Sequence, residues 1–196
     1  VDRERLTLSL VAGGPTPVTF MPGEAKSHEI WLALGPTDGA QLAATVARPP
    51  LLVNADYFNR TGVFGPAAPL RADNPWTTFA AKTYGEKSLP ELGMHTGVRH
   101  YPDEPYLGRT DSWSNDYNGR LSSLWSVWLA TGDRVWFDRA VAFSSHLMDV
   151  GIVHSEVPGQ DWLGALHGPG PNHVAGPWNP LLRGEGFAHF ARWTGN

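Results

Sequence analysis

Cysteine is absent from this chain of 196 residues, which excludes disulfide bonds and cysteine-ligated metal sites. Charged residues are also scarce, at 17%, and no run of Lys or Arg occurs. With a formal net charge of −4, this composition argues against a nucleic-acid-binding or membrane-surface protein. No apolar run approaches the roughly 18 residues of a membrane span, and no segment resembles a signal peptide. We therefore expect a globular protein, and since it begins at Val1, an excised piece of a longer one.

Aromatic residues, by contrast, are abundant, and Trp is over-represented among them. Nine Trp, eight Phe and five Tyr make up 11% of the chain. Sugar rings present flat C–H faces that stack on such side chains, although burial in the core is the commoner fate of any single Trp. Carbohydrate binding is therefore a first hypothesis.

The first 35 residues have the pattern of short β-strands. In LTLSL (6–10) leucine alternates with polar residues, and PVTFMP and SHEIWLAL follow after turn-forming stretches. We expect an antiparallel β segment here, then a short helix at 38–47 that Pro49 ends. Long irregular loops follow at 49–75 and 85–114, with a weak helical pattern at 75–84.

From residue 115 onward the pattern is helical. The apolar residues of the first helix fall on one face: Leu121, Leu124, Trp125, Trp128 and Leu129. Gly132 suits the end of this helix and Asp133 the N-cap of the next, so an antiparallel hairpin is expected. Its second helix continues the apolar face: Phe137, Ala140, Val141, Leu147 and Met148. A third helix is predicted at 184–193.

These patterns together predict an α+β fold, with a β-rich segment at 1–72 and helical hairpins at 73–196. The Thr-Gly-Asp that ends the first helix at 131–133 is echoed by Thr-Gly-Asn at 194–196. A repeat of this kind indicates an array of hairpins that bury apolar faces against their neighbours. We therefore expect the chain to associate with further hairpins or with itself.

A glycine-rich connection between the second and third helices carries the most reactive side chains. It contains His154, His167 and His173, then Arg183 and Glu185. Three histidines in a surface loop indicate a site rather than core packing. They can act as acid or base, or bind a divalent metal such as Zn²⁺, although their spacing matches no tight metal motif. The bland alternative is that they hydrogen-bond loop carbonyls.

The stretch before the first helix is a second candidate region. Trp113, Asn115, Asp116, Tyr117 and Asn118 lie near the expected helix N-terminus. Asn115 or Asp116 is expected to serve as the N-cap, because short polar side chains accept from the unsatisfied N–H groups there. The remaining polar residues then favour a cleft at the end of the bundle.

Asp149 stands at the unfavourable end of the second helix. A carboxylate near a helix C-terminus costs roughly 0.3–1 kcal/mol. His146 lies three residues earlier, on the same face of an α-helix. We expect Asp149 to orient His146 or His154, or alternatively to accept from an N–H of the following loop.

Several segments resemble one family. VRHYPD, WSNDYNGR, ATGDRVWFDRAVAFSSHLMDVGIVH, GALHGPGPNHV and RGEGFAHFARWTGN, in this order, are similar to the helical core of exo-acting rhamnogalacturonan lyase-like proteins. MPGEAKSHEIWLAL resembles the β segment before that core. The resemblance covers most of residues 16–196. The chain departs from it at Asn118, where an aspartate is expected, and at NPLLRGEG, where an aromatic is usual.

The resemblance implies an incomplete (α/α) toroid with a polysaccharide lyase site among its inter-helix loops, in a secreted or periplasmic protein. The positions that match the family's motifs are Trp113, Asn115, Tyr117, His146, Asp149, His154, His167, His173 and Glu185. Its implied partner is a uronate-containing, pectin-like polysaccharide, without a required cofactor.

A lyase that acts on a uronate must neutralise the sugar carboxylate, remove the C5 proton and protonate the leaving oxygen. By residue type, Arg183 or Arg99 would neutralise the carboxylate. His154 or His173 would be the base, and Tyr117 or His167 the acid. We expect Trp113, Asn115, Asn118, Arg99 and Glu185 to contact substrate.

Two other functions stay open at this point. A glycoside hydrolase needs two carboxylates about 5–9.5 Å apart, and the chain offers several. These candidates are Asp116, Asp149, Glu156, Asp161 and Glu185. The other alternative is a non-catalytic carbohydrate-binding or structural piece, whose histidines only fasten loops.

Overall fold

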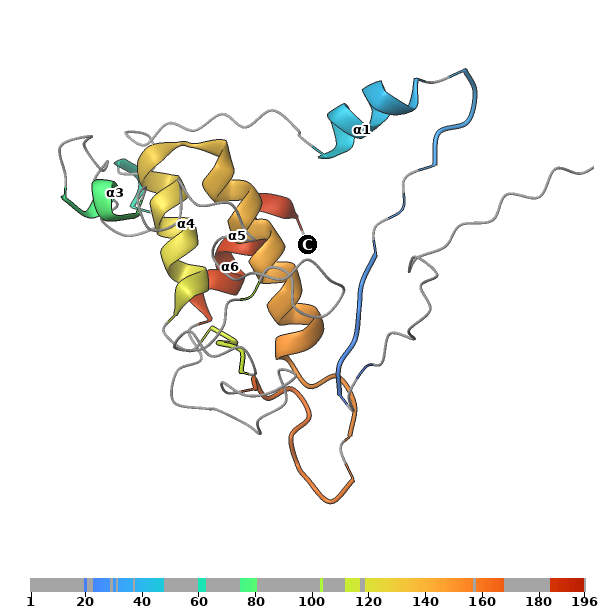
Figure 1. Ribbon diagram of the computed structural model, residues 1–196, viewed down its shortest axis with the longest axis vertical. Helices are drawn as coiled ribbons and strands as arrows, with labels where there is room; N and C mark the ends of the chain where they lie inside the picture. The colour runs from blue at the N-terminus through green and yellow to red at the C-terminus, as the bar shows by residue number, and fades with distance from the viewer. Residues whose placement is uncertain are drawn as a thin grey trace, which may run out of the picture.

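A computed structural model describes residues 20, 23–28, 30, 32–36, 38–47, 60–62, 75–80, 103, 112–116, 119–156, 158–167 and 184–195. Its elements, in chain order, are α1 (Gly39–Ala47), α3 (Pro75–Ala80), α4 (Arg120–Thr131), α5 (Arg134–His146), the π-helical turn η3 (Leu147–Gly151) and α6 (Glu185–Thr194). Helices α4 and α5 form an antiparallel hairpin against which α6 packs, whereas α1 stands apart (Figure 1). The described part of the chain is therefore a small helical bundle with extended segments around it.

The hairpin forms where the sequence predicts it. All five residues of the apolar face of α4 are buried, from Leu121 to Leu129. Gly132 takes the left-handed conformation, with φ 69°, and its N–H binds the Trp128 carbonyl. Asp133 is the N-cap of α5, since its carboxylate accepts from the Val135 N–H. The helices predicted at 38–47 and 184–193 are confirmed. Of the helix predicted at 75–84, residues 75–80 form α3, and residues 81–84 lie outside the described residues.

The core of the bundle is aromatic. Trp128 lies edge-on to Phe137 at 5.1 Å between ring centroids and to Trp193 of α6 at 4.6 Å. Trp125 packs against Trp128 and Phe137 at 5.7 Å in each case. These rings pack the three helices together. The Trp residues of this part therefore belong to the hydrophobic core and do not form a surface for stacking sugars.

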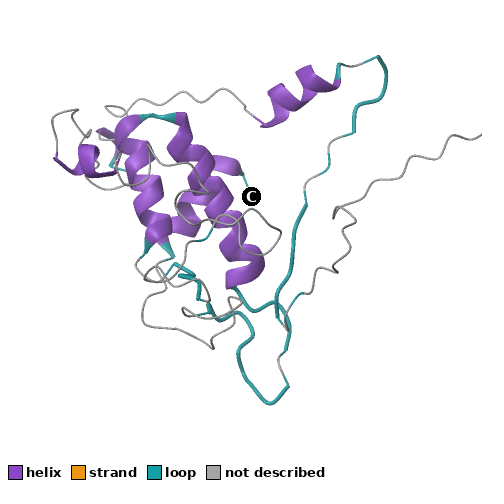
Figure 2. Ribbon diagram, viewed as in Figure 1, coloured by secondary structure: helices purple, strands orange, loops and turns teal. Residues whose placement is uncertain are grey.

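The expected N-terminal antiparallel β segment is not seen, and the α+β fold class is wrong. No strand occurs among the described residues, and the described residues of 20–36 form a loop (Figure 2). Ile30, Leu32 and Leu34 are 49%, 74% and 97% exposed. An apolar stretch forms a stable strand only where a neighbouring strand and an apolar layer cover it. The exposure of these three side chains shows that no such layer covers them. Residues 6–10 and the boundary expected at 72/73 lie outside the described residues.

None of the helices in the described ranges combines the length and the apolar character needed to cross a membrane.

Helix α6 lies close to α4 at Gly186. A Cβ at this position would lie 2.5 Å from Cγ of Leu121, which is fully buried. By contrast, a Cβ at Gly184 would meet nothing within 4 Å. The absence of a side chain at residue 186 therefore sets the distance between the two helices.

Gly186→Ala is expected to lower the free energy of unfolding by about 1–3 kcal/mol, because the added methyl group overpacks the contact with Leu121. Gly184→Ala is the matched control and should be nearly neutral. Urea unfolding of both variants measures the difference. Equal stability of the two variants would show that α6 does not pack on α4 in this way.

Candidate functional site

The candidate site lies at the end of the bundle where α4 begins and α5 ends. The predicted site residues with described side chains belong to segments that meet there: Trp113, Asn115, His146, Asp149, His154 and His167. Glu185 opens α6, and its side chain is not described. The other predicted residues lie outside the described part of the chain: Arg99, Tyr117, Asn118, His173 and Arg183.

A buried polar cluster occupies the inner side of this end. The carboxylate of Asp103 accepts from the Asn115 backbone N–H at 3.0 Å, and its Oδ2 lies 3.8 Å from Nε2 of His146. The three residues are at most 1% exposed. Sequence analysis did not single out Asp103, although it ends the motif VRHYPD. His146 therefore lies beside Asp103, from a loop that precedes α4, rather than beside Asp149.

The chain reaches α4 through a strained turn. Asn115 and Asp116 have φ of 45° and 62°, in the left-handed region that non-glycine residues seldom adopt. Such conformations cost about 1–3 kcal/mol each and cluster at functional sites. The turn is held because Asp116 Oδ1 accepts from the Leu121 N–H at 2.8 Å. Asp116 thus caps α4 from a distance, while Gly119 occupies the formal N-cap position.

The pKa of Asp116 is raised toward neutral pH. Burial raises its pKa from 3.8 to about 6, and the nearby charge of Asp103 acts in the same direction. The hydrogen bond from Leu121 and the charge of Arg120 lower the pKa in part. Arg120 also lies over the ring of Phe143, 4.9 Å from its centroid, and that ring stacks on His146. The cluster thus combines two carboxylates, an imidazole and a guanidinium.

Asp116→Asn is expected to remove one source of pH-dependent stability. With a folded pKa above its ordinary value, Asp116 favours folding below about pH 4, and this contribution is lost as pH rises through about 6. The variant should match the wild type near pH 4 and exceed its stability by about 3 kcal/mol at pH 7. Denaturant unfolding at several pH values measures this difference.

Asp138→Asn is the control, because it removes an exposed carboxylate of α5 that pairs with Arg134. This variant should not exceed the stability of the wild type at pH 7, because it loses the ion pair. A loss of stability in Asp116→Asn at pH 7 would contradict the account.

The second part of the site is built on the widened turn η3. Here the Ile152 N–H binds the Leu147 carbonyl at 2.9 Å, and the Val153 N–H binds Ala165 instead of the helix. Neither N–H group reaches the Met148 carbonyl, and Nε2 of His154 binds it. A carbonyl only accepts, so Nε2 carries the hydrogen. In the neutral ring Nδ1 then holds the basic lone pair, on an exposed side chain.

Asp149 is compensated by the N-terminal segment rather than by a histidine. Its Oδ2 accepts from the Ser27 N–H at 3.0 Å and lies 3.3 Å from Nζ of Lys26. In an α-helix, residues three apart lie on the same face. The wider π-helical turn rotates Asp149 away from the face that carries His146, so the two side chains do not meet. An N–H partner was the alternative expected from the sequence, although from the following loop. Lys26 was not anticipated, because PGEAK was interpreted only as a turn.

His167 differs from His154 in its surroundings. The side chain of His167 is fully buried, and Trp162 lies edge-on to its ring. The backbone N–H of His167 binds the Gly151 carbonyl at 2.8 Å. Next to it Leu166 pairs with Ile152 in an isolated antiparallel bridge. The two described histidines of the loop therefore have different environments, one internal and one facing solvent.

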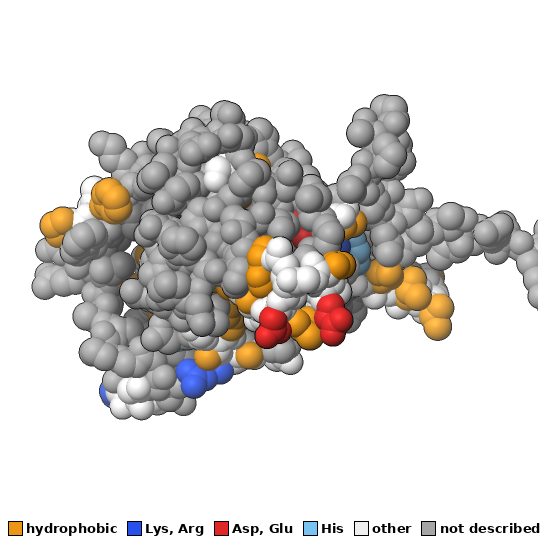
Figure 3. Space-filling model, turned by 90° about the horizontal axis from the view of Figure 1, so that it is seen from below, with side chains coloured by type: hydrophobic (Ala, Val, Ile, Leu, Met, Phe, Trp, Pro, Cys, Tyr) orange, Lys and Arg blue, Asp and Glu red, His pale blue; other side chains and the backbone are white. Residues whose placement is uncertain are grey.

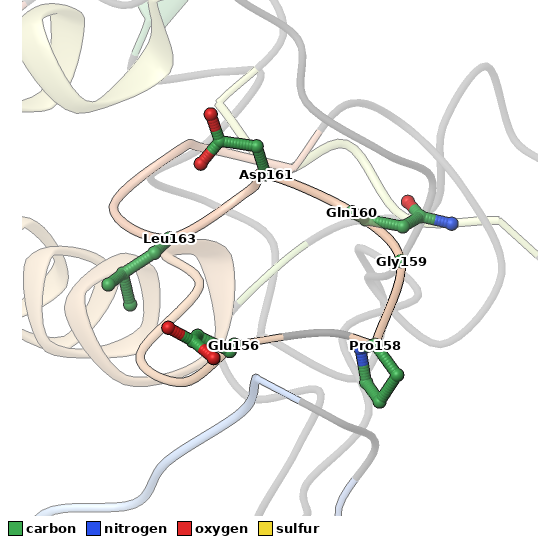
Figure 4. A pocket seen from close by; sticks show the side chains of 6 residues that line it. All are labelled: Glu156, Pro158, Gly159, Gln160, Asp161 and Leu163. Atoms are coloured by element: carbon green, nitrogen blue, oxygen red, sulfur yellow. The ribbon is translucent and has the colours of Figure 1, made fainter.

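The loop after His154 borders an open cavity of about 550 Å³. Its lining consists of Glu156, Pro158, Gly159, Gln160, Asp161 and Leu163. Figure 4 shows the side chains of Glu156 and Asp161 on opposite sides of this loop. Viewed from below, two acidic side chains project next to each other, and a basic side chain lies beside a histidine further along the same face (Figure 3). The exposed face of the site therefore carries charges of both signs among hydrophobic side chains.

The divalent metal considered for the histidine loop stays a prediction. No group of three potential ligands occurs among the described residues, and His173 lies outside them. His154 directs Nε2 to a carbonyl, while His167 is fully buried. The two imidazoles are thus held by the protein in different ways.

Comparison with known proteins gives no relative, because no family model, curated protein or solved structure matches this chain.

Proposed function

We propose that this chain is a carbohydrate-active enzyme, a lyase that cleaves a uronate-containing, pectin-like polysaccharide by β-elimination outside the cell. The observation that carries the proposal is the state of His154. Its Nε2–H is bound to the Met148 carbonyl, and Nδ1 is the basic atom of an exposed ring. A histidine whose Nε2–H is held by a carbonyl presents Nδ1 as the basic atom, and is suited to act as a general base.

In the proposed reaction, Nδ1 of His154 removes the proton from C5 of the uronate. The electron pair forms the C4–C5 double bond, the bond from C4 to the glycosidic oxygen breaks, and that oxygen takes a proton from an acid. Tyr117 stays the predicted acid, since His167 is fully buried and cannot touch a polysaccharide. Arg99 and Arg183 stay candidates for neutralising the carboxylate.

The buried cluster supports this site from behind. Asp103, Asn115 and His146 are too deeply buried to touch a polymer, as is Trp113 at 5% exposed. Their hydrogen bonds fix the strained turn that leads into α4. Asp103 and His146 are therefore proposed as positioning residues, and Trp113 and Asn115 are not proposed to contact the substrate.

Incubation with galacturonate-containing polysaccharides is expected to produce an unsaturated sugar that absorbs in the ultraviolet, because elimination leaves a double bond conjugated with the carboxylate. Absorbance and reducing ends should rise together. Reducing ends without absorbance would indicate hydrolysis instead. The absence of both with every uronate polysaccharide would contradict the proposed enzyme.

His154→Ala and His154→Gln are both expected to lower kcat at least a hundredfold, because neither side chain is a base. The amide N–H of the Gln variant can replace Nε2 as donor to the Met148 carbonyl, which separates the base from the loop fastener. Steady-state rates of both variants are the measurement. If Gln restores activity, His154 acts only through the loop.

Hydrolysis is a second candidate function, favoured by the cavity. Glu156 and Asp161 both line it, and a glycoside hydrolase uses a pair of carboxylates that flank the scissile bond. Replacing each singly by the amide would abolish the appearance of reducing ends if hydrolysis is the reaction. A lyase with His154 as base would keep its absorbance signal.

A further inference from the structure

We propose that Lys26 binds the carboxylate of the sugar, so that the N-terminal segment 23–28 is part of the site. This inference rests on the proposed function and names a residue for the step that the sequence assigned to Arg99 or Arg183. The two regions are far apart in the chain, since Lys26 pairs with a residue on η3.

The N-terminal segment is fixed to the end of α5 at several points. The Ala25 N–H binds the Asp149 backbone carbonyl at 2.9 Å, and the Ser27 N–H binds the Asp149 carboxylate. The His154 N–H binds the Gly23 carbonyl at 2.8 Å. The backbone of Gly23, three residues before Lys26, is therefore bonded directly to the backbone of His154, the proposed base.

Gly23 allows this close docking. It has φ 92°, a conformation that suits glycine, and a Cβ there would lie 2.8 Å from Cγ1 of Val153. Val153 is itself almost fully buried and directly precedes His154. The segment is thus packed against the backbone that carries the histidine, so its position and that of His154 are coupled.

The charge of Lys26 faces outward relative to its partner. The side chain of Lys26 is 22% exposed and that of Asp149 is 7% exposed. Asp149 Oδ2 also accepts from the Ser27 N–H, so the carboxylate is satisfied on its inner side. An ammonium group has three N–H donors, and a second carboxylate can share them with Asp149. A bound uronate would complete a carboxylate–ammonium–carboxylate bridge.

The acidic side chains near Lys26 indicate which part of the substrate this cation binds. The cavity after His154 is lined by Glu156 and Asp161, which repel a uronate carboxylate and attract sugar hydroxyl groups. Lys26 is the group of opposite sign that the described structure anchors beside this loop. We therefore infer that Lys26 fixes the acidic sugar at His154, while the cavity takes a neutral neighbouring unit.

The test is calorimetric binding of an oligosaccharide of alternating galacturonate and rhamnose units, and of its methyl ester, to the full chain. Lys26→Met is expected to weaken binding of the acid about tenfold and to leave binding of the ester unchanged. Lys26→Arg should retain the preference for the acid, because it keeps the charge. Arg134→Met is the matched control, since it removes a cation from the ion pair with Asp138 on α5.

Three results would overturn the inference: unchanged binding of the acid by Lys26→Met, equal weakening of acid and ester, or no binding of the acid by the wild type. Equal weakening would mean that Lys26 only holds the segment in place. Failure of the proposed lyase reaction gives a different result from failure of Lys26 binding. If Lys26 discriminates acid from ester but no absorbing product forms, the binding site stands and the lyase reaction falls.

Discussion

The ladder of hydrogen bonds in α5 widens by one residue at its end, and the arrangement of the site depends on this change. In η3 the Ile152 N–H binds Leu147, and the Val153 N–H turns away to Ala165. The Met148 carbonyl then receives Nε2 of His154. Helix ends always leave such carbonyls to be satisfied, and single π turns often occur at functional sites. Here the requirement of one backbone carbonyl sets both the position and the tautomer of an exposed histidine.

The same turn recruits a distant part of the chain. Asp149 lies where the helix dipole disfavours a carboxylate, and Lys26 and Ser27 compensate it. Compensation by a local histidine would have left Lys26 and the Ser27 N–H without this carboxylate partner on η3. The ion pair is partly exposed, so its own contribution to stability is modest. Its consequence is geometric, since it brings an ammonium group to the backbone that carries His154.

The hairpin was predictable because its determinants are local. Apolar spacing, Gly132 as the C-cap and Asp133 as the N-cap each act within a few residues, and all are confirmed. The β segment was wrong because the apolar run at 30–34 says nothing about whether a second strand is present. Six of the predicted site residues do lie at one end of the bundle. Asp103 and Lys26 were missed because each acts through a partner more than 40 residues away, His146 and Asp149 respectively.

The tautomer of His154 tests the central claim most directly. Nitrogen-15 chemical shifts of its imidazole ring, measured on the neutral side chain, distinguish a protonated nitrogen from one that carries a lone pair. The account predicts a ring protonated at Nε2, with Nδ1 as the unprotonated base. A ring protonated at Nδ1, or the averaged shifts of a free histidine, would contradict it, because His154 would then not be held by the Met148 carbonyl.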